Sequence, residues 1–271
     1  MPRFLVSYHL HERLTDLDVP VETDQTISIE LAGADPWARM AQLYGAVPAA
    51  VAGAVREGGR PTVVSGDCTT ALGTVAGLQR AGLRPSLVWI DGHGDLQTLE
   101  TTTSGYLGGL PLRLLAGYRP ELIAAALDLR AVPEDRIVLV DARDLDPPEE
   151  QYLRRAAIRR VGVTDLTLPA WPDGPLYVHL DLDVLDPADL PGLRFPATGG
   201  PSQAGVADAL QRVIAGGQVA AVGLACTWQG GHGAARSVQD AVVAALGPFA
   251  AGHAPSPSPG RVGSGARRPP R

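Results

Sequence analysis

The chain has 271 residues, of which 45% are hydrophobic, and its formal charge is −6 at neutral pH. This length suffices for one large α/β domain with a full core, or for two small domains. The negative charge provides no basic field for nucleic acid, and no apolar stretch is long enough to span a membrane. We therefore expect a globular protein that binds neither nucleic acid nor a membrane.

The cysteine content and the first residues predict a location. The amino-terminal segment lacks the apolar core of a signal peptide. Only Cys68 and Cys226 occur, which is too few for a disulfide framework. We expect a cytoplasmic protein, in which a thiolate is available as a ligand.

Short apolar runs alternate with alanine-rich stretches along the chain. This alternation predicts a mostly parallel sheet with helices on both faces, and the continuously apolar strands fit burial on both sides. The expected strands cover 3–8, 61–65, 86–91, 136–141, 176–182 and 219–226. The expected helices cover 36–57, 69–81, 108–117, 120–129, 149–158, 203–215 and 234–248.

The composition changes near the carboxyl end. Residues 251–271 consist mainly of Pro, Gly, Ser, Ala and Arg, which leaves too little apolar surface for a core. We predict one folded domain over 1–250 and a disordered tail over 251–271.

Metal-binding side chains gather where three of the apolar runs end. The members of this group are Asp67 and Cys68, then Asp91, His93 and Asp95, then Asp181 and Asp183. Side chains at alternate positions of a strand point to one side, and the carboxyl ends of parallel strands meet in one crevice. A single Asp or His of this kind could be a helix cap or a hydrogen-bonded core residue. Such structural roles are a poor explanation for the whole group, because carboxylates are rarely buried without a partner or a metal. The pattern predicts a site for two divalent ions, with Mn²⁺ favoured by the carboxylates and Zn²⁺ or Fe²⁺ by the thiolate.

Five motifs, SGDCTTALG, DGHGD, TTTSG, DLDVLDP and FPATGGP, resemble those of the arginase (ureohydrolase) superfamily in order and spacing, over most of residues 60–245. The resemblance implies the three-layer αβα arginase fold, a catalytic domain over 1–250 and two Mn²⁺ ions. The implied ligands are Asp91 and Asp181 as bridges, Cys68 and Asp95 for one ion, and His93 and Asp183 for the other. Asp95 would also be catalytic, by orienting the hydroxide that bridges the metals.

The resemblance also implies where an amino-acid substrate would lie. Gln97 and Ser104 match positions that contact an α-carboxylate, and Asp146 and Glu149 match carboxylates that receive an α-ammonium. A plainer interpretation makes these ordinary loop residues, with Asp146 capping the helix expected near residue 149. Serving as a cap would not prevent a ligand role.

Departures from the family concentrate at the reacting centre. Cys68 replaces a histidine ligand, and it is either a thiolate ligand or a spectator beside a weak site. Gly108 replaces a histidine proposed to pass a proton to the leaving amine. Tyr106, Glu100 and His232 are candidates for the missing group.

A further departure concerns the guanidinium. Trp228 lies near the position of the glutamate that pairs with this cation, although Thr227 or Gln229 is an alternative for facing the site. Gly200 replaces a supporting threonine. His179 shares the strand face of the metal carboxylates, and we expect it to be a core residue.

These departures have a common electrostatic consequence. A guanidinium stays cationic and needs an anionic partner when it leaves water, whereas an N-hydroxylated guanidine is less basic and can bind neutral. The departures resemble those of the family members that cleave Nω-hydroxy-L-arginine to L-ornithine and hydroxyurea in D-cycloserine biosynthesis. We therefore predict this amidinohydrolase activity on a small amino-acid substrate.

Two other hypotheses stay open. One is a ureohydrolase acting on arginine, agmatine or an acylated polyamine, and Asp146 and Glu149 discriminate here because agmatine has no α-amino-acid end. The other is a non-catalytic homologue that binds metal. Animal arginases use a carboxyl-terminal segment for trimer contacts, and the tail replaces it here, so we expect a monomer.

Overall fold

A parallel sheet forms the centre of the molecule. The computed structural model describes residues 1–166 and 171–250. The eight strands of the sheet lie in the order β4-β1-β5-β10-β9-β6-β7-β8, and each paired neighbour is parallel. In chain order they are β1 (Arg3–Val6), β4 (Gln25–Thr26), β5 (Thr62–Ser65), β6 (Ser86–His93), β7 (Ile137–Asp144), β8 (Arg159–Val161), β9 (Pro175–Asp181) and β10 (Gln218–Ala225).

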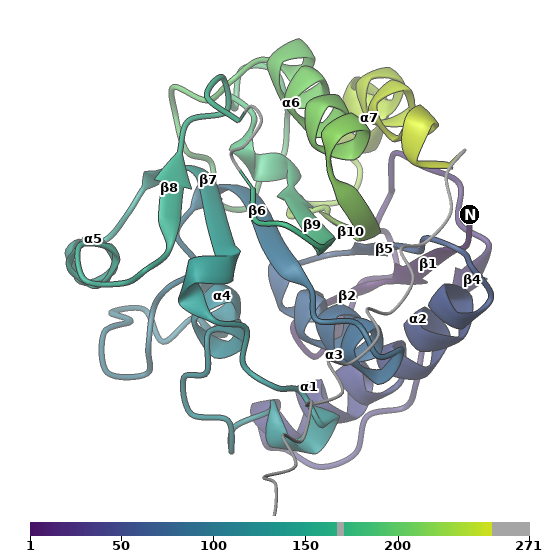
Figure 1. The fold of residues 1–271 in the computed structure, drawn as a ribbon, viewed down its shortest axis with the longest axis vertical. Coiled ribbons are helices and arrows are strands. Elements are labelled where there is room, and N and C mark those ends of the chain that lie inside the picture. Colours follow the sequence, from purple (N-terminus) through teal and green to yellow (C-terminus); the bar gives the residue numbers. More distant parts are fainter. Residues whose placement is uncertain (167–170, 251–271) are drawn as a thin grey trace, which may run out of the picture.

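Helices cover both faces of this sheet. Figure 1 shows α1 to α4 on one side of the strands and α6 and α7 on the other. The helices are α1 (Pro36–Gly45), α2 (Val47–Arg56), α3 (Ala71–Arg80), α4 (Pro111–Leu115), α5 (Pro147–Leu153), α6 (Gln203–Gly216) and α7 (Ala234–Ala250). The predicted α/β class, with a mostly parallel sheet between helical layers, is confirmed.

The sequence of β6 shows why the sheet is buried on both faces. Leu87 and Trp89 pack into the core beneath α1 to α4, whereas Val88 and Ile90 pack into the core beneath α6 and α7. Successive side chains of a strand point to opposite faces, so a continuous apolar run supplies both cores at once.

Several predicted boundaries differ from the structure. The predicted helix 36–57 is two helices, because Pro48 lacks the N–H that a continuous helix needs and its ring obstructs the preceding turn. The predicted helix 120–129 is wrong: the segment forms turns with one 3₁₀ turn, Ala125–Leu127, and leaves it at Asp128 with a φ of 54°. Strands of two or three residues, such as β4 and β8, are too short to give a recognisable period.

A small hairpin of β2 (Tyr8–His9) and β3 (Glu12–Arg13) stands outside the main sheet. The predicted tail over 251–271 lies outside the described residues, so the division after residue 250 stays a prediction. Within the described part of the chain, no helix is long and apolar enough to cross a bilayer.

Candidate metal centre

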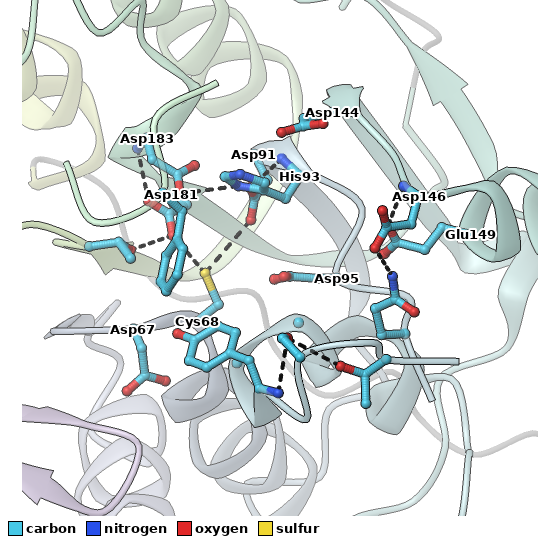
Figure 2. Close-up of a pocket in the computed structure, with 18 of the residues that line it drawn as sticks. Asp67, Cys68, Asp91, His93, Asp95, Asp144, Asp146, Glu149, Asp181 and Asp183 are labelled. Atoms are coloured by element: carbon cyan, nitrogen blue, oxygen red, sulfur yellow. Dashed lines mark hydrogen bonds and ion pairs between the residues drawn. The ribbon is translucent and has the colours of Figure 1, made fainter. Parts of the chain in front are cut away.

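The predicted site residues come together in one pocket of about 190 Å³. All of them line it: Cys68, Asp91, His93, Asp95, Gln97, Ser104, Asp146, Glu149, Asp181 and Asp183. The pocket lies at the carboxyl ends of the neighbouring strands β5, β10, β9 and β6. Figure 2 shows the ligand candidates converging from these strand ends, with Asp146 and Glu149 across the pocket from Asp181 and Asp183.

The two predicted bridging carboxylates are held by the same local device. Asp91 Oδ1 accepts a hydrogen bond from the backbone N–H of His93 at 2.7 Å, and Asp181 Oδ1 accepts one from that of Asp183 at 2.8 Å. The second oxygens are also held, by Trp89 Nε1 at 3.2 Å for Asp91 and by Thr227 Oγ1 at 2.5 Å for Asp181. Partners of this kind fix the orientation of a carboxylate before a metal arrives.

Cys68 faces both of these carboxylates. Its Sγ lies 2.8 Å from Asp181 Oδ2 and 3.7 Å from Asp91 Oδ2. Burial raises the pKa of the Cys68 thiol well above its usual value, and the charges of Asp181 and Asp95 raise it further. The thiol therefore stays protonated, and its S–H donates a hydrogen bond to a carboxylate, as long as no cation lies among these groups.

His93 faces a second pair of carboxylates, those of Asp183 and Asp91. Its Nδ1 lies 3.2 Å from Asp183 Oδ2 and 3.4 Å from Asp91 Oδ1. Burial lowers the pKa of His93, but the hydrogen bonds and charges of Asp183 and Asp91 outweigh burial and raise that pKa to about 12. The carboxylates thus draw a positive charge to this position, either a proton or a metal ion.

Two buried carboxylate oxygens support the assignment of a cation site. Among the described residues, Asp95 Oδ2 and Asp183 Oδ1 are buried and have no hydrogen-bond partner. Burial, together with the charge of Asp91, raises the pKa of Asp95 well above its usual range and that of Asp183 to about 7. Buried carboxylates this close together are unfavourable without a counter-charge, and divalent cations supply it.

Ligand atoms gather in two groups within which all atoms lie within 4.8 Å of one another. One group is Asp91, His93 and Asp183, and the other is Cys68, Asp91 and His179. The shared Asp91 agrees with a bridging position between two ions. Carboxylate and imidazole donors suit Mn²⁺, and a thiolate in the second group draws its preference toward Zn²⁺ or Fe²⁺. The residues present therefore fit a pair of divalent cations.

His179 lies closer to this centre than its sequence position suggested. It is buried, its ring stacks on Trp89 with 3.8 Å between centroids, and its Nδ1 lies 3.1 Å from the hydroxyl of Tyr177. Burial lowers the pKa of His179 to about 4. The ring is thus neutral, with a nitrogen near Cys68 and Asp91, so the interpretation as an ordinary core residue is incomplete. In the sequence, the spacing of His179 two residues before Asp181 on one strand already indicated that both side chains point to the same face.

The four predicted substrate contacts lie together, but in different environments. Asp146 is exposed and accepts a hydrogen bond from Gln97 Nε2 at 2.6 Å. Ser104 is exposed on a loop, where its Oγ accepts from the N–H of Tyr106 at 3.2 Å. Asp146, Gln97 and Ser104 thus offer polar groups to a ligand.

Glu149 is buried and uses both carboxylate oxygens locally. It accepts from the N–H groups of Leu96 at 2.9 Å and Asp146 at 3.0 Å. A Cβ at position 94 would lie 2.7 Å from Glu149 Oε1, so the second glycine of DGHGD is needed for this approach. Glu149 thus connects α5 to the loop that carries the metal ligands.

The end of β10 presents a neutral side chain to the pocket. Thr227 lines the pocket, whereas Trp228 is fully buried in the core, where its Nε1 donates to Asp18 Oδ1 at 3.1 Å. Of the alternatives left by the sequence, Thr227 is therefore the residue that faces the site. The space beside Gly200 is filled by the guanidinium of Arg143 and the carbonyl oxygen of Val184.

Comparison with known proteins agrees with this geometry. The family model described as "Arginase family" matches residues 5–226. The arginase of Bacillus caldovelox is 35% identical over 56% of this chain and 56% of its own length. An N(omega)-hydroxy-L-arginine amidinohydrolase of Streptomyces lavendulae is 36% identical over 48% of this chain and 47% of its own. The structure of Bacillus subtilis arginase superposes with a TM-score of 0.74 at 22% identity, over 90% of this chain and 97% of that one.

The fold is that of the solved arginases, and the clustered side chains at its strand ends could hold divalent cations. The chain belongs to the arginase family, because the family model matches most of its length. The matched segment spans about half the length of the first of these relatives. The choice of substrate and metal is therefore a separate question, which the pocket residues address.

Proposed function

We propose that the protein is a dimanganese amidinohydrolase that cleaves Nω-hydroxy-L-arginine to L-ornithine and hydroxyurea. Asp91 and Asp181 would bridge the two ions, and the other ligands are Cys68, Asp95, His93 and Asp183. When bound, such a metal pair lowers the pKa of a water molecule and polarises the guanidine carbon.

Asp95 is suited to hold a proton at the reacting centre. Its Oδ2 is buried without a hydrogen-bond partner among the described residues, and its φ of 54° places it in the left-handed region at the DGHGD turn. Burial and the charge of Asp91 raise the pKa of Asp95 well above its usual value, so this oxygen readily accepts a proton.

The observation that carries the choice of substrate is the neutral end of β10. Thr227 faces the pocket there and donates to Asp181, while Trp228 is turned into the core. Arginine brings a permanent cation, which is costly to bury without an anionic partner. Hydroxyarginine can bind with a neutral guanidine, so it suits this end of the pocket better.

The opposite side of the pocket suits the amino-acid end of the same substrate. Asp146 offers an exposed carboxylate for an α-ammonium, and Gln97 and Ser104 offer polar groups for an α-carboxylate. Agmatine has no α-carboxylate, so it cannot use Gln97 and Ser104. The proposal includes that the enzyme is a monomer, binds a small amino-acid substrate and works in D-cycloserine antibiotic biosynthesis. These parts rest on the resemblance described under Sequence analysis.

The test is ornithine release by protein reconstituted with Mn²⁺. We expect hydroxyarginine to be cleaved with a kcat/KM at least about 10-fold above that for arginine, because one unpartnered buried charge costs well over the 1.4 kcal/mol that a factor of ten requires. Equal or faster cleavage of arginine would overturn the substrate assignment. Absence of turnover with hydroxyarginine, arginine and agmatine would favour a non-catalytic homologue.

A further inference from the structure

A phenol lies in the wall of the pocket beside the metal ligands. Tyr106 lines the same pocket as Cys68 and Asp95. The other two candidates for the missing histidine do not line it: Glu100 is exposed and pairs with Arg119, and His232 is exposed. Among these three groups, the structure places only Tyr106 where it can touch a substrate.

Tyr106 occupies the space that a side chain at position 108 would need. Gly108 is buried, and a Cβ built on it would overlap the hydroxyl and the adjacent ring carbons of Tyr106. A histidine at position 108 and the present position of this phenol therefore exclude each other. Gly108 thus leaves the space that the ring of Tyr106 occupies.

Tyr106 is held in place by residues from distant parts of the chain. Its hydroxyl lies 3.0 Å from Nε2 of His9, which belongs to β2. Its ring centroid lies 4.8 Å from that of Phe195 and 5.8 Å from that of His9. These contacts restrict the rotation of the ring and fix the position of its oxygen.

The hydrogen bonds of His9 decide which way the phenol proton points. Nδ1 of His9 lies 3.1 Å from the carbonyl oxygen of Gly66, which can only accept, so Nδ1 carries a proton. In the neutral ring Nε2 is then an acceptor, and Tyr106 donates its proton to it. The lone pairs of the phenol oxygen remain for a ligand. Burial, followed by the charges of Asp67 and Cys68, raises the pKa of Tyr106, so the phenol stays neutral.

We propose that Tyr106 is a specificity-determining residue whose oxygen accepts a hydrogen bond from the N–OH of the bound hydroxyguanidine. His9 is a positioning residue that orients this oxygen. Hydroxyarginine carries an N–OH donor that arginine lacks, so an acceptor placed at this group favours hydroxyarginine. The inference rests on the proposed function, because it assumes that the guanidine end lies beside Tyr106.

The experiment measures binding apart from turnover. In an Asp95→Asn background, which blocks catalysis under the proposed mechanism, the affinities for hydroxyarginine and for ornithine are measured by calorimetry with and without Tyr106→Phe. We expect roughly a 10-fold loss for hydroxyarginine, the size of one lost hydrogen bond, and less than a 2-fold change for ornithine, which has no guanidine. Tyr8→Phe is the matched control, since its hydroxyl binds Ile29 outside the pocket.

A double-mutant cycle tests the coupling to Gly108. Gly108→Ala should displace the phenol and reproduce the loss seen with Tyr106→Phe, and the double variant should be no weaker than either single variant. His9→Ala should weaken hydroxyarginine binding, and His9→Gln should restore part of it by returning an acceptor near the phenol. Metal content by mass spectrometry should be the same in each of these variants as in the Asp95→Asn background protein.

The outcomes separate this inference from the proposed function. If the wild-type protein cleaves hydroxyarginine but Tyr106→Phe binds it within 2-fold of the background protein, only the role of Tyr106 is overturned. The same holds if ornithine binding falls equally. If the wild-type protein neither cleaves nor binds hydroxyarginine, the proposed function fails and the role of Tyr106 fails with it.

Discussion

The thiol sulfur of Cys68 lies 2.8 Å from Oδ2 of Asp181, an oxygen that also accepts a hydrogen bond from Thr227. Cys68 follows β5 and Asp181 ends β9, two strands separated in the sheet by β10. The thiol of Cys68 is thus a potential anion next to a predicted bridging carboxylate. If a metal binds here, we expect its preference to depend on Cys68.

Replacing the thiol should change which metal the protein prefers. We expect Cys68→Ser to lower the affinity for Zn²⁺ more than that for Mn²⁺, because thiolate ligands stabilise Zn²⁺ selectively. Competition titrations of the metal-free protein with both ions measure this ratio. Cys226→Ser is the matched control, since Cys226 is buried but does not line the pocket. An unchanged ratio would show that Cys68 is a spectator.

Removing one bridging carboxylate should empty both metal positions. Asp181→Asn keeps the shape of the side chain but loses the charge that both ions would share, so we expect metal content near zero and no ornithine release. Elemental analysis after dialysis against Mn²⁺ measures this. Asp208→Asn, at an exposed position of α6, should retain full metal content. Full metal content in Asp181→Asn would mean that Asp181 is not a bridging ligand.

The hydroxyl of Thr227 should support the metal site without binding the metal. Thr227→Val has nearly the same shape but cannot donate to Asp181, and loss of such a partner typically lowers metal affinity about 10- to 100-fold. The expected result is weaker Mn²⁺ binding in a fluorescence or calorimetric titration, with activity recovered at high Mn²⁺. If affinity is unchanged, the 2.5 Å contact does not orient Asp181.

The carboxylate of Asp146 should affect substrate binding more than the chemical step. Asp146→Asn should raise KM for hydroxyarginine roughly 10-fold with little change in kcat, because the lost interaction is the same in the ground state and in the transition state. Steady-state kinetics on Mn²⁺-loaded protein provides the measurement. A fall in kcat at constant KM would contradict a role at the α-ammonium.

The metal-free protein should lose stability as the pH rises from about 4 to 7. Burial and the charge of Asp91 raise the pKa of Asp183 to about 7, whereas an aspartate in an unfolded chain titrates near about 3.9. In this window the folded protein keeps a proton that the unfolded chain has released, so the free energy of unfolding falls as the pH rises. The pKa of His93, which is raised to about 12, also makes the free energy of unfolding fall as the pH rises. Its contribution is complete below about 6.5 and is lost as the pH rises toward 12.

Urea unfolding in a chelator between pH 4 and 8 measures this dependence. His179 acts in the opposite direction, because burial lowers its pKa to about 4. Comparison with Asp183→Asn separates the two effects, and the variant should show a smaller decrease. Mn²⁺ should reverse the trend in the wild-type protein, since the metal competes with protons for the same atoms. A wild-type profile no steeper than that of Asp183→Asn would refute the prediction.

The sequence alone determined the fold class and predicted which residues line the pocket, for local physical reasons. A strand such as β6 is buried on both faces, which its continuous apolar run indicates. Asp91 and His93 lie on β6, whereas Asp95 follows the strand in a turn with a φ of 54°, which strand alternation did not predict. Short strands such as β8 and the turns around Ala125–Leu127 escaped prediction, because their conformation depends on neighbours rather than on a period.

Only the tertiary structure decided what surrounds the metal ligands. The choice between Thr227 and Trp228 depends on which side chain the core behind β10 can bury, and Asp18 supplies the partner of the indole from a distant segment. The position of Tyr106 depends on His9, which is 97 residues away in the chain. Such contacts join residues that no sequence spacing relates, so packing alone brings them together.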